Sequence, residues 1–237
     1  MEISLFIPTI PEHIKYLDNI LDIYLNKSSI KPDEIIVSVS NYKVIPTDVL
    51  SPMFEKHQNV KFFLHDNIML AGPNRQVSKD FCNGDIIIYQ DSDDLPHIQR
   101  IEIIKHFFEN YDILHLNHSY NDISEYNEDI INISEINYID GDILNQITFP
   151  NNKLTECVDN FRGYGCFNDL LIHGGAIAIK KSVLDVIRWK NRDELYFSPG
   201  WDNINYKGAE DYEFNMESTF HLKKSMLIDS KCYFYRQ

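Results

Sequence analysis

The sequence has few basic residues, and it lacks a long apolar run. Lys and Arg total 22 against 36 Asp and Glu, which gives a formal net charge of −14. A chain this acidic repels phosphate backbones and anionic lipid surfaces, so we expect no nucleic-acid partner. No apolar run is long enough to span a bilayer, and the chain does not open with a signal-peptide pattern. We therefore expect no transmembrane segment and a cytoplasmic location.

Cysteine is also scarce, and its spacing is uninformative. The four cysteines, Cys82, Cys157, Cys166 and Cys232, form no CxxC pair, and the histidines complete no zinc pattern. With 237 residues, 43% of them hydrophobic, the chain can bury a core that needs no disulfides. Reduced thiols in a reducing compartment are the expectation.

Apolar runs and amphipathic segments alternate through the first half of the sequence. The predicted strands are Ile3–Ile7, ending at Pro8, then Glu34–Val39, Val60–Leu64 and Asp85–Gln90, with helical patterns between them. This rhythm predicts an α/β fold, with a mostly parallel central sheet and helices on both faces in a single Rossmann-like domain.

The second half is less regular. Residues 118–141 are rich in Asn, Asp, Ser and Glu, and a strand is predicted again only at Gly174–Ile179. A last helix is expected to begin near Gly208, followed by short strands. No linker-like composition divides the chain, so we expect one domain over 1–237. Within it, residues 1–114 are expected to bind a nucleotide and residues 115–237 an acceptor.

Acidic residues follow the most apolar predicted strand. Asp91, Asp93 and Asp94 come directly after Gln90, at the end of a strand where open parallel sheets bind ligands. Crowded carboxylates repel one another, and a hard cation such as Mg²⁺ or Mn²⁺ relieves the repulsion. The alternative is an acidic turn that caps the next helix.

Two other functions of an acidic loop can be compared with this segment. An EF-hand needs glycine where Pro96 stands and a side-chain ligand where Leu95 stands, so it is excluded. A phosphatase of the haloacid-dehalogenase type also places DxD after an apolar strand and uses the first Asp, here Asp91, as its nucleophile. It normally has Thr or Val at the position of Leu95, and it is kept as an alternative.

Three blocks of the sequence resemble family 2 glycosyltransferases of the GT-A fold: Ile3–Pro11, Ala71–Arg100 and Gly174–Asn215. The resemblance implies a nucleotide-diphospho-sugar transferase fold. It implies nucleotide contacts by Pro8 and Thr9 after the first strand.

The second block implies nucleotide contact by Arg75 at a helix start. In the same block the resemblance maps the DxD motif onto Asp91, Ser92 and Asp93. Asp91 and Ser92 are thereby expected to contact the nucleotide, and Asp93 with Asp91 to hold the metal.

The third block carries an acidic pair. The family's general base maps onto Glu210-Asp211, at the start of the last predicted helix. A carboxylate in the first helical turn is kept ionised by the helix dipole and can accept the proton of an attacking hydroxyl. In-line attack then inverts the anomeric centre. Without the other two blocks, Glu210 and Asp211 would be interpreted only as residues that cap the N-terminus of a helix.

The sequence departs from the family at two places. Val39, Ser40 and Asn41 stand where acidic residues usually read the base, so a UDP-sugar donor is favoured on the resemblance alone, with Ser40 as a base contact. The family's closing Tyr-Arg-x-His is represented only by Tyr235-Arg236-Gln237. A third metal ligand is then expected from His173, from His221 or from beyond residue 237.

The acceptor is not readable from the sequence. Trp201 and Tyr164 offer flat faces for a sugar ring, although core packing explains aromatic residues as well. The absence of a QxxRW motif argues against a processive synthase. The expected activity is therefore transfer of a hexose, with inversion, to a glycan, a lipid-linked or a protein acceptor; a catalytically inactive GT-A binding module is the further alternative.

Overall fold

The computed structural model of the protein describes residues 1–116, 123–149, 151–153, 174–194, 210–222, 224–229, 232–234 and 236. Within these residues, one sheet has the strand order β3-β2-β1-β4-β8-β6-β9-β7, and two short strands pair apart from it. The bounds are β1 (Ile3–Thr9), β2 (Glu34–Val39), β3 (Val60–Leu64), β4 (Ile86–Tyr89), β6 (Ile113–Leu116), β7 (Asn137–Asp140), β8 (Ile177–Lys180) and β9 (Ser225–Asp229), with β5 (Leu95–Pro96) and β10 (Tyr233–Phe234) forming the small pair.

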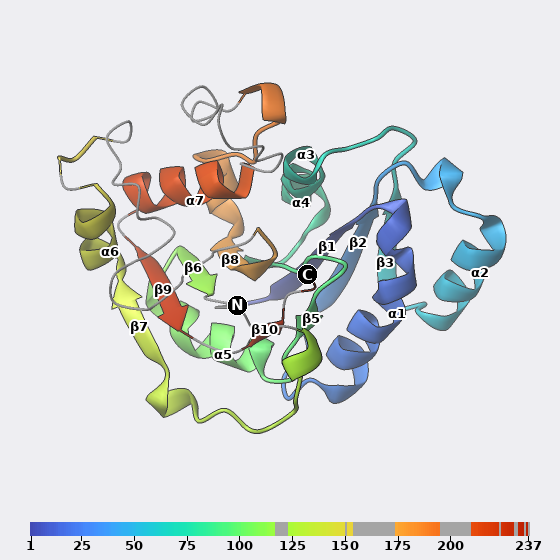
Figure 1. The fold of residues 1–237 in the computed structure, drawn as a ribbon, viewed down its shortest axis with the longest axis horizontal. Helices are drawn as coiled ribbons and strands as arrows, with labels where there is room; N and C mark the ends of the chain where they lie inside the picture. The colour runs from blue at the N-terminus through green and yellow to red at the C-terminus, as the bar shows by residue number, and fades with distance from the viewer. Residues whose placement is uncertain are drawn as a thin grey trace.

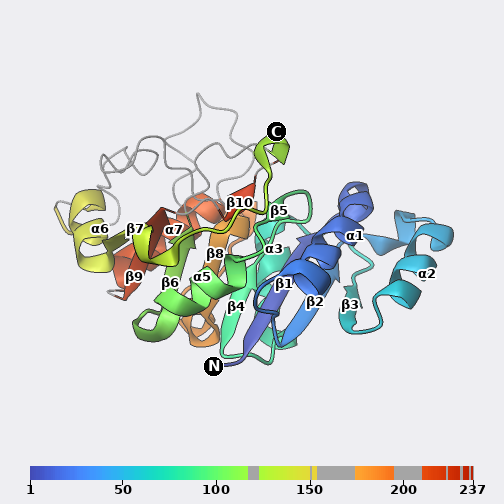
Figure 2. The ribbon, with the colours of Figure 1, turned by 90° about the horizontal axis from the view of Figure 1, so that it is seen from below.

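The sheet is mostly parallel, as the sequence predicts. Strands β3, β2, β1 and β4 are parallel neighbours, and β6 is parallel to β9 (Figure 2). Strand β8 is inserted antiparallel between β4 and β6, and β7 runs antiparallel at the edge. The carboxyl ends of β1, β2 and β4 therefore meet at one edge of the sheet, which is where ligands bind in such folds.

Helices cover both faces of the sheet (Figure 1). Their bounds are α1 (Ile14–Asp22), α2 (Thr47–Lys56), α3 (Ala71–Gln76), α4 (Ser78–Phe81), α5 (Arg100–Phe107), α6 (Gly141–Thr148) and α7 (Glu210–His221). Single turns of other helical types lie at Pro11–His13, Ile23–Lys27, Tyr42–Val44, Phe108–Asn110, Ile123–Glu125, Ile133–Glu135, Gly174–Ala176, Lys181–Asp185 and Arg192–Glu194.

Strand β1 supplies side chains to the core on each face. Ile3, Leu5 and Ile7 pack with α1 and α5, whereas Phe6 points to the other side, toward the core under α4 and α7. This alternation follows from the two-residue period of a strand. Both faces of the strand are buried, which is why its sequence is mostly apolar; the buried hydroxyl of its polar residue Ser4 donates to Glu34.

Two local predictions differ from the structure. Strand β1 does not stop at Pro8 but runs through it to Thr9, with Pro8 opposite Ser38 of β2. Pairing with β4 ends at Phe6, so Pro8 has a strand neighbour on one side only, and proline is tolerated there. The segment predicted to be irregular contains β7, which is stabilised by antiparallel pairing with β9.

Candidate functional site

The acidic loop, residues 90–94, directly follows β4 and is closed by the side chain of Gln90. The amide nitrogen of Gln90 donates to the backbone oxygens of Asp91 (2.9 Å) and Asp94 (3.0 Å). Gln90 is itself buried and accepts from Tyr24 and Arg100. The buried side chain of Gln90 therefore fixes the backbone of the acidic loop. The three carboxylates of the loop have different partners, which are described next.

Asp91 is paired with Arg75. The Nη2 of Arg75 lies 2.6 Å from Oδ1 of Asp91, and its Nη1 lies 3.2 Å from Oε1 of Glu210. Burial alone would lower the pKa of Arg75, but the negative charges of Asp91, Glu210 and Asp211 outweigh it and raise that pKa. One buried guanidinium therefore joins the DxD segment to the acidic pair at the start of α7.

Close packing fixes the guanidinium of Arg75. It lies over the ring of Trp189, 5.1 Å from the centroid, and Trp189 stacks on Phe214 of α7 with centroids 3.9 Å apart. A Cβ on Gly174 would lie 2.3 Å from Cζ of Arg75, and one on Gly175 would lie 2.6 Å from Cγ of Asp91. These two glycines let the backbone before β8 approach the ion pair.

A second ion pair anchors α7. The Nζ of Lys190 lies 2.5 Å from a carboxylate oxygen of Glu213 and 2.5 Å from one of Glu217, one helical turn further along. Lys190 and Glu213 are buried. This contact holds the first turns of α7 beside the cleft, so that Glu210 and Asp211 begin the helix next to Arg75.

Asp93 lies beside the turn that follows β1. Its Oδ1 is 3.7 Å from Nδ1 of His13, and the Oγ of the buried Ser92 is 3.3 Å from the same nitrogen. Burial raises the pKa of Asp93, and the charge of Asp91 raises it further, whereas His13 acts to lower it. A carboxyl with a raised pKa is one that a cation would stabilise in its ionised form.

Asp94 is buried and contacts Tyr233 and Arg236. Its carboxylate accepts hydrogen bonds from the hydroxyl of Tyr233 and from the backbone N–H of Arg236, each at 2.7 Å. The Nε of Arg236 also donates to the backbone oxygen of Asp93 at 2.8 Å. Burial, together with the charge of Asp91, raises the pKa of Asp94 to about 8. Asp94 is thus a structural partner of residues 233–236.

A cleft of about 450 Å³ lies next to these groups. Its described lining is Ile10, Pro11, Glu12, Ser40, Asn41, Ile68, Met69, Leu70, Ala71, Gly72, Lys190 and Glu210. Ser40 stands at its wall, where its hydroxyl accepts from the backbone N–H of Met69 (2.7 Å) and donates to the backbone oxygen of Met69 (3.2 Å). The cleft therefore extends from the end of β2 to the start of α7.

The structure places the sequence-predicted site residues as follows. Ser40 and Glu210 line the cleft, and Arg75 joins Asp91 to Glu210 there. Ser92 and Asp93 lie beside His13, the residue that follows the lining residue Glu12. Pro8 and Thr9 are buried at the end of β1, directly before the lining residue Ile10. Trp201, Tyr164 and His173 lie outside the described residues.

His221 is not at the site. It ends α7, eleven residues after Glu210, so the helical rise puts it about 17 Å from the acidic pair. The expectation that His221 supplies a third metal ligand is wrong, because the helix that positions Glu210 carries His221 away from it.

The residues present suit a divalent ion that is shared with a phosphate ligand. Among the described residues, no three His, Cys, Asp or Glu side chains are arranged to hold a metal by themselves. Mg²⁺ and similar ions commonly bind through one or two carboxylates together with substrate phosphates and water. Asp93 and Asp91 would supply one or two carboxylate ligands and leave the other positions of the ion to phosphate and water. The pKa of Asp93 is raised because burial and the nearby charge of Asp91 disfavour its ionised form.

Two residues of the site carry no recognisable signal in the sequence. His13 follows the first strand by four residues and falls in a short turn, where histidine has no diagnostic spacing. Lys190 pairs with carboxylates 23 and 27 positions later, a separation that only tertiary structure can close.

Solved structures with a similar fold include nucleotide-sugar-bound proteins. TarS from Staphylococcus aureus, in complex with UDP-GlcNAc, matches with a TM-score of 0.64 and 17% identity over 100% of this chain and 59% of that one. A mycobacterial protein matches with a TM-score of 0.59 and 13% identity over 100% and 67%. The mannosyltransferase PcManGT from Pyrobaculum calidifontis, in complex with GDP-Man and Mn²⁺, matches with a TM-score of 0.53 and 11% identity over 97% and 54%.

These similarities establish the fold predicted from the sequence: the chain has a GT-A-like α/β fold. The chain spans about three-fifths (59%) of the length of the TarS structure. No protein-family model matches the sequence, and no curated protein matches it. Among the described residues, no helix combines the length and apolar character needed to cross a membrane.

Proposed function

We propose that this chain is a metal-dependent, inverting glycosyltransferase that moves a hexose from a nucleoside-diphosphate sugar to a hydroxyl acceptor. UDP-sugar is the favoured donor. The observation that carries the proposal is the buried Arg75, which joins Asp91 of the DxD segment to Glu210 of the acidic pair beside one cleft. Nucleotide sugars bound to proteins of similar fold are consistent with it.

The donor is proposed to lie in the cleft with its base toward Ser40 and its diphosphate toward the acidic loop. Backbone and side-chain groups of Pro8, Thr9 and Ser92 would contact the nucleotide at the strand ends. The diphosphate is anionic and the protein is acidic, so a cation is required between them. When bound by Asp93 and Asp91, Mn²⁺ or Mg²⁺ supplies that positive charge and stabilises the leaving diphosphate.

Asp211 is proposed as the general base, with Glu210 beside it. Both begin α7, where the helix dipole favours the ionised carboxylate. A carboxylate at this position can take the proton of the acceptor hydroxyl as the hydroxyl attacks the anomeric carbon. Attack from the side opposite the leaving diphosphate inverts that carbon.

The acceptor side is assigned to the later half of the chain, residues 115–237, and Trp201 and Tyr164 are proposed to contact the acceptor. A glycan, a lipid-linked saccharide and a protein hydroxyl are the classes considered. A cytoplasmic location is also proposed.

The phosphatase alternative is less well supported. It requires Asp91 as a nucleophile, but an oxygen of that carboxylate accepts a 2.6 Å hydrogen bond from a buried arginine. A carboxylate held in this way is a positioned anion and a weaker nucleophile. The other alternative, a GT-A module that binds a nucleotide sugar without catalysis, is one of the outcomes that the experiment below distinguishes.

The test is titration of UDP, GDP and their sugars by calorimetry, with and without Mn²⁺, followed by donor turnover. We expect one nucleoside diphosphate to bind more tightly with Mn²⁺, and Asp211→Asn to bind it unchanged while losing donor hydrolysis or transfer. No Mn²⁺-dependent nucleotide binding would overturn the proposal. Binding without turnover under any acceptor would identify the inactive module.

A further inference from the structure

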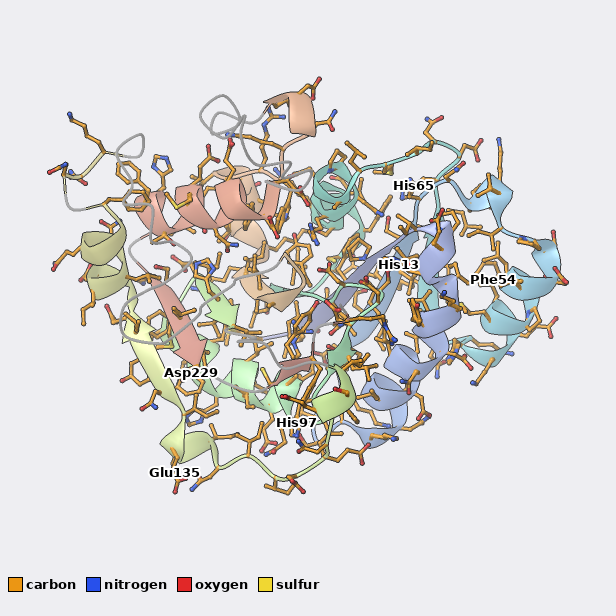
Figure 3. All side chains as sticks on the ribbon, in the orientation of Figure 1. His13, Phe54, His65, His97, Glu135 and Asp229 are labelled. Carbon is orange, nitrogen blue, oxygen red and sulfur yellow. The ribbon has the colours of Figure 1, made fainter. Side chains whose placement is uncertain are left out.

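His13 lies beside Asp93, and both side chains are partly exposed. It lies at the end of the single turn between β1 and α1 (Figure 3), and its Nδ1 is 3.7 Å from Oδ1 of Asp93. The two side chains are 30% and 29% exposed, so solvent and ligands reach both. The imidazole of His13 therefore lies next to the partly exposed carboxylate of Asp93 in the acidic loop.

These two atoms are too far apart for a hydrogen bond, and they are close enough for both to contact one ion. A hydrogen bond between nitrogen and oxygen is about 2.7–3.2 Å long, and 3.7 Å exceeds it. Two ligands each about 2.1 Å from an ion are roughly 3.0 Å apart when at right angles and about 4.2 Å apart when opposite. The separation of 3.7 Å between Nδ1 and Oδ1 falls between these limits.

The other carboxylates of the loop have different partners. Asp91 accepts from Arg75, and Asp94 accepts from Tyr233 and the backbone of Arg236. Asp93 is therefore the carboxylate of the loop whose described side-chain neighbour is an imidazole. With Nε2 carrying the proton, the Nδ1 of a neutral His13 has a lone pair available for a cation.

We propose that His13 and Asp93 together hold the divalent ion, with donor phosphate oxygens and water as the remaining ligands. This inference rests on the proposed function. Because an imidazole nitrogen is a softer ligand than a carboxylate, His13 would make the site prefer Mn²⁺ over Mg²⁺.

The first experiment measures free Mn²⁺ by electron paramagnetic resonance while the protein is titrated in the presence of UDP or GDP. His13→Ala is compared with wild type, with Asp93→Asn, and with His106→Ala as the matched control, since His106 is exposed on α5. We expect His13→Ala to weaken Mn²⁺ binding on the order of tenfold and to weaken Mg²⁺ competition much less. His106→Ala should behave as wild type.

The second experiment detects the ligand directly. Pulsed electron paramagnetic resonance of the Mn²⁺–nucleotide complex should reveal a directly bound imidazole nitrogen in wild type and His106→Ala, and should lose it in His13→Ala. Thermal melting by circular dichroism establishes that each variant is folded, and His13→Gln replaces His13→Ala if the latter is not.

The outcomes are separable. Unchanged Mn²⁺ affinity in His13→Ala, or no nitrogen signal in wild type, overturns the role of His13 and leaves the proposed function intact. Absence of nucleotide-dependent Mn²⁺ binding in wild type overturns both. Equal losses of Mn²⁺ and Mg²⁺ affinity would show that His13 only supports Asp93, and would also overturn the proposal.

Discussion

The Nη1 of Arg75 lies 3.2 Å from Oε1 of Glu210, although 135 positions separate the two residues in the sequence. Arg75 is on α3 and Glu210 opens α7, so this contact joins the two halves of the chain at the cleft. The same guanidinium bonds Asp91, 16 positions away. One side chain therefore bonds both the acidic loop and the start of α7.

Removal of Arg75 should destabilise the protein strongly. Arg75→Ala removes the buried cation that bonds the half-buried carboxylates of Asp91 and Glu210, and loss of one member of a buried ion pair costs about 3–5 kcal/mol. Urea unfolding followed by circular dichroism measures the change. Arg188→Ala is the control, because its pair with Glu194 is exposed and should contribute less than about 1 kcal/mol. Equal effects of the two substitutions would contradict the assigned role of Arg75.

Lys190 should control the position of α7. Lys190→Met removes the buried ammonium group that pairs with both Glu213 and Glu217, so we expect a loss of about 3 kcal/mol in the free energy of unfolding. Adding Glu213→Gln to Lys190→Met should restore part of that loss. Lys43→Met, at an exposed pair with Asp66, is the control. No rescue in the double variant would show that the charges on α7 do not matter.

Asp94 should make stability depend on pH. Its pKa is raised from 3.8 to about 8 in the folded protein, so the folded state holds a proton that the unfolded chain releases. The stabilisation is complete below pH 3.8 and is lost as pH rises through about 8. In Asp94→Asn this loss should be absent, and the difference in slope is up to about 1.4 kcal/mol per pH unit.

Urea unfolding of wild type and Asp94→Asn between pH 5 and pH 8, in the presence of a chelator, measures the two slopes. The amide keeps one accepting oxygen for Tyr233 or Arg236 and removes the charge. Parallel profiles for the two proteins would mean that Asp94 does not titrate in this range.

Ser40 should affect the cleft through the backbone of Met69. Ser40→Ala removes a hydroxyl that both donates to and accepts from that residue, which costs about 1–2 kcal/mol of stability. It should also weaken nucleotide binding, because residues 68–70 form one wall of the cleft. Ser29→Ala, at an exposed hydroxyl, is the control. Calorimetric titration of UDP and GDP into both variants measures the change in affinity. Unchanged affinity in Ser40→Ala would show that this wall of the cleft does not contact the nucleotide base.

The sequence determined the local elements of the first half and the acidic loop. Strands such as Ile3–Ile7 were readable because a strand buried on both faces is rich in apolar residues. Asp91 and Asp93 were readable as candidates because a strand end in such a sheet is a ligand edge. The start of α7 at Glu210-Asp211 followed from helical patterning near Gly208.

Only the tertiary structure decided which charges meet. In the sequence Asp91, Asp93 and Asp94 form one cluster, whereas in the structure they lie separately against Arg75, His13 and Tyr233. It also inserts β8 between β4 and β6 and stabilises β7 by pairing with β9. Local propensity acts over a few residues, whereas ion pairs and strand order depend on contacts between segments that are distant in the chain.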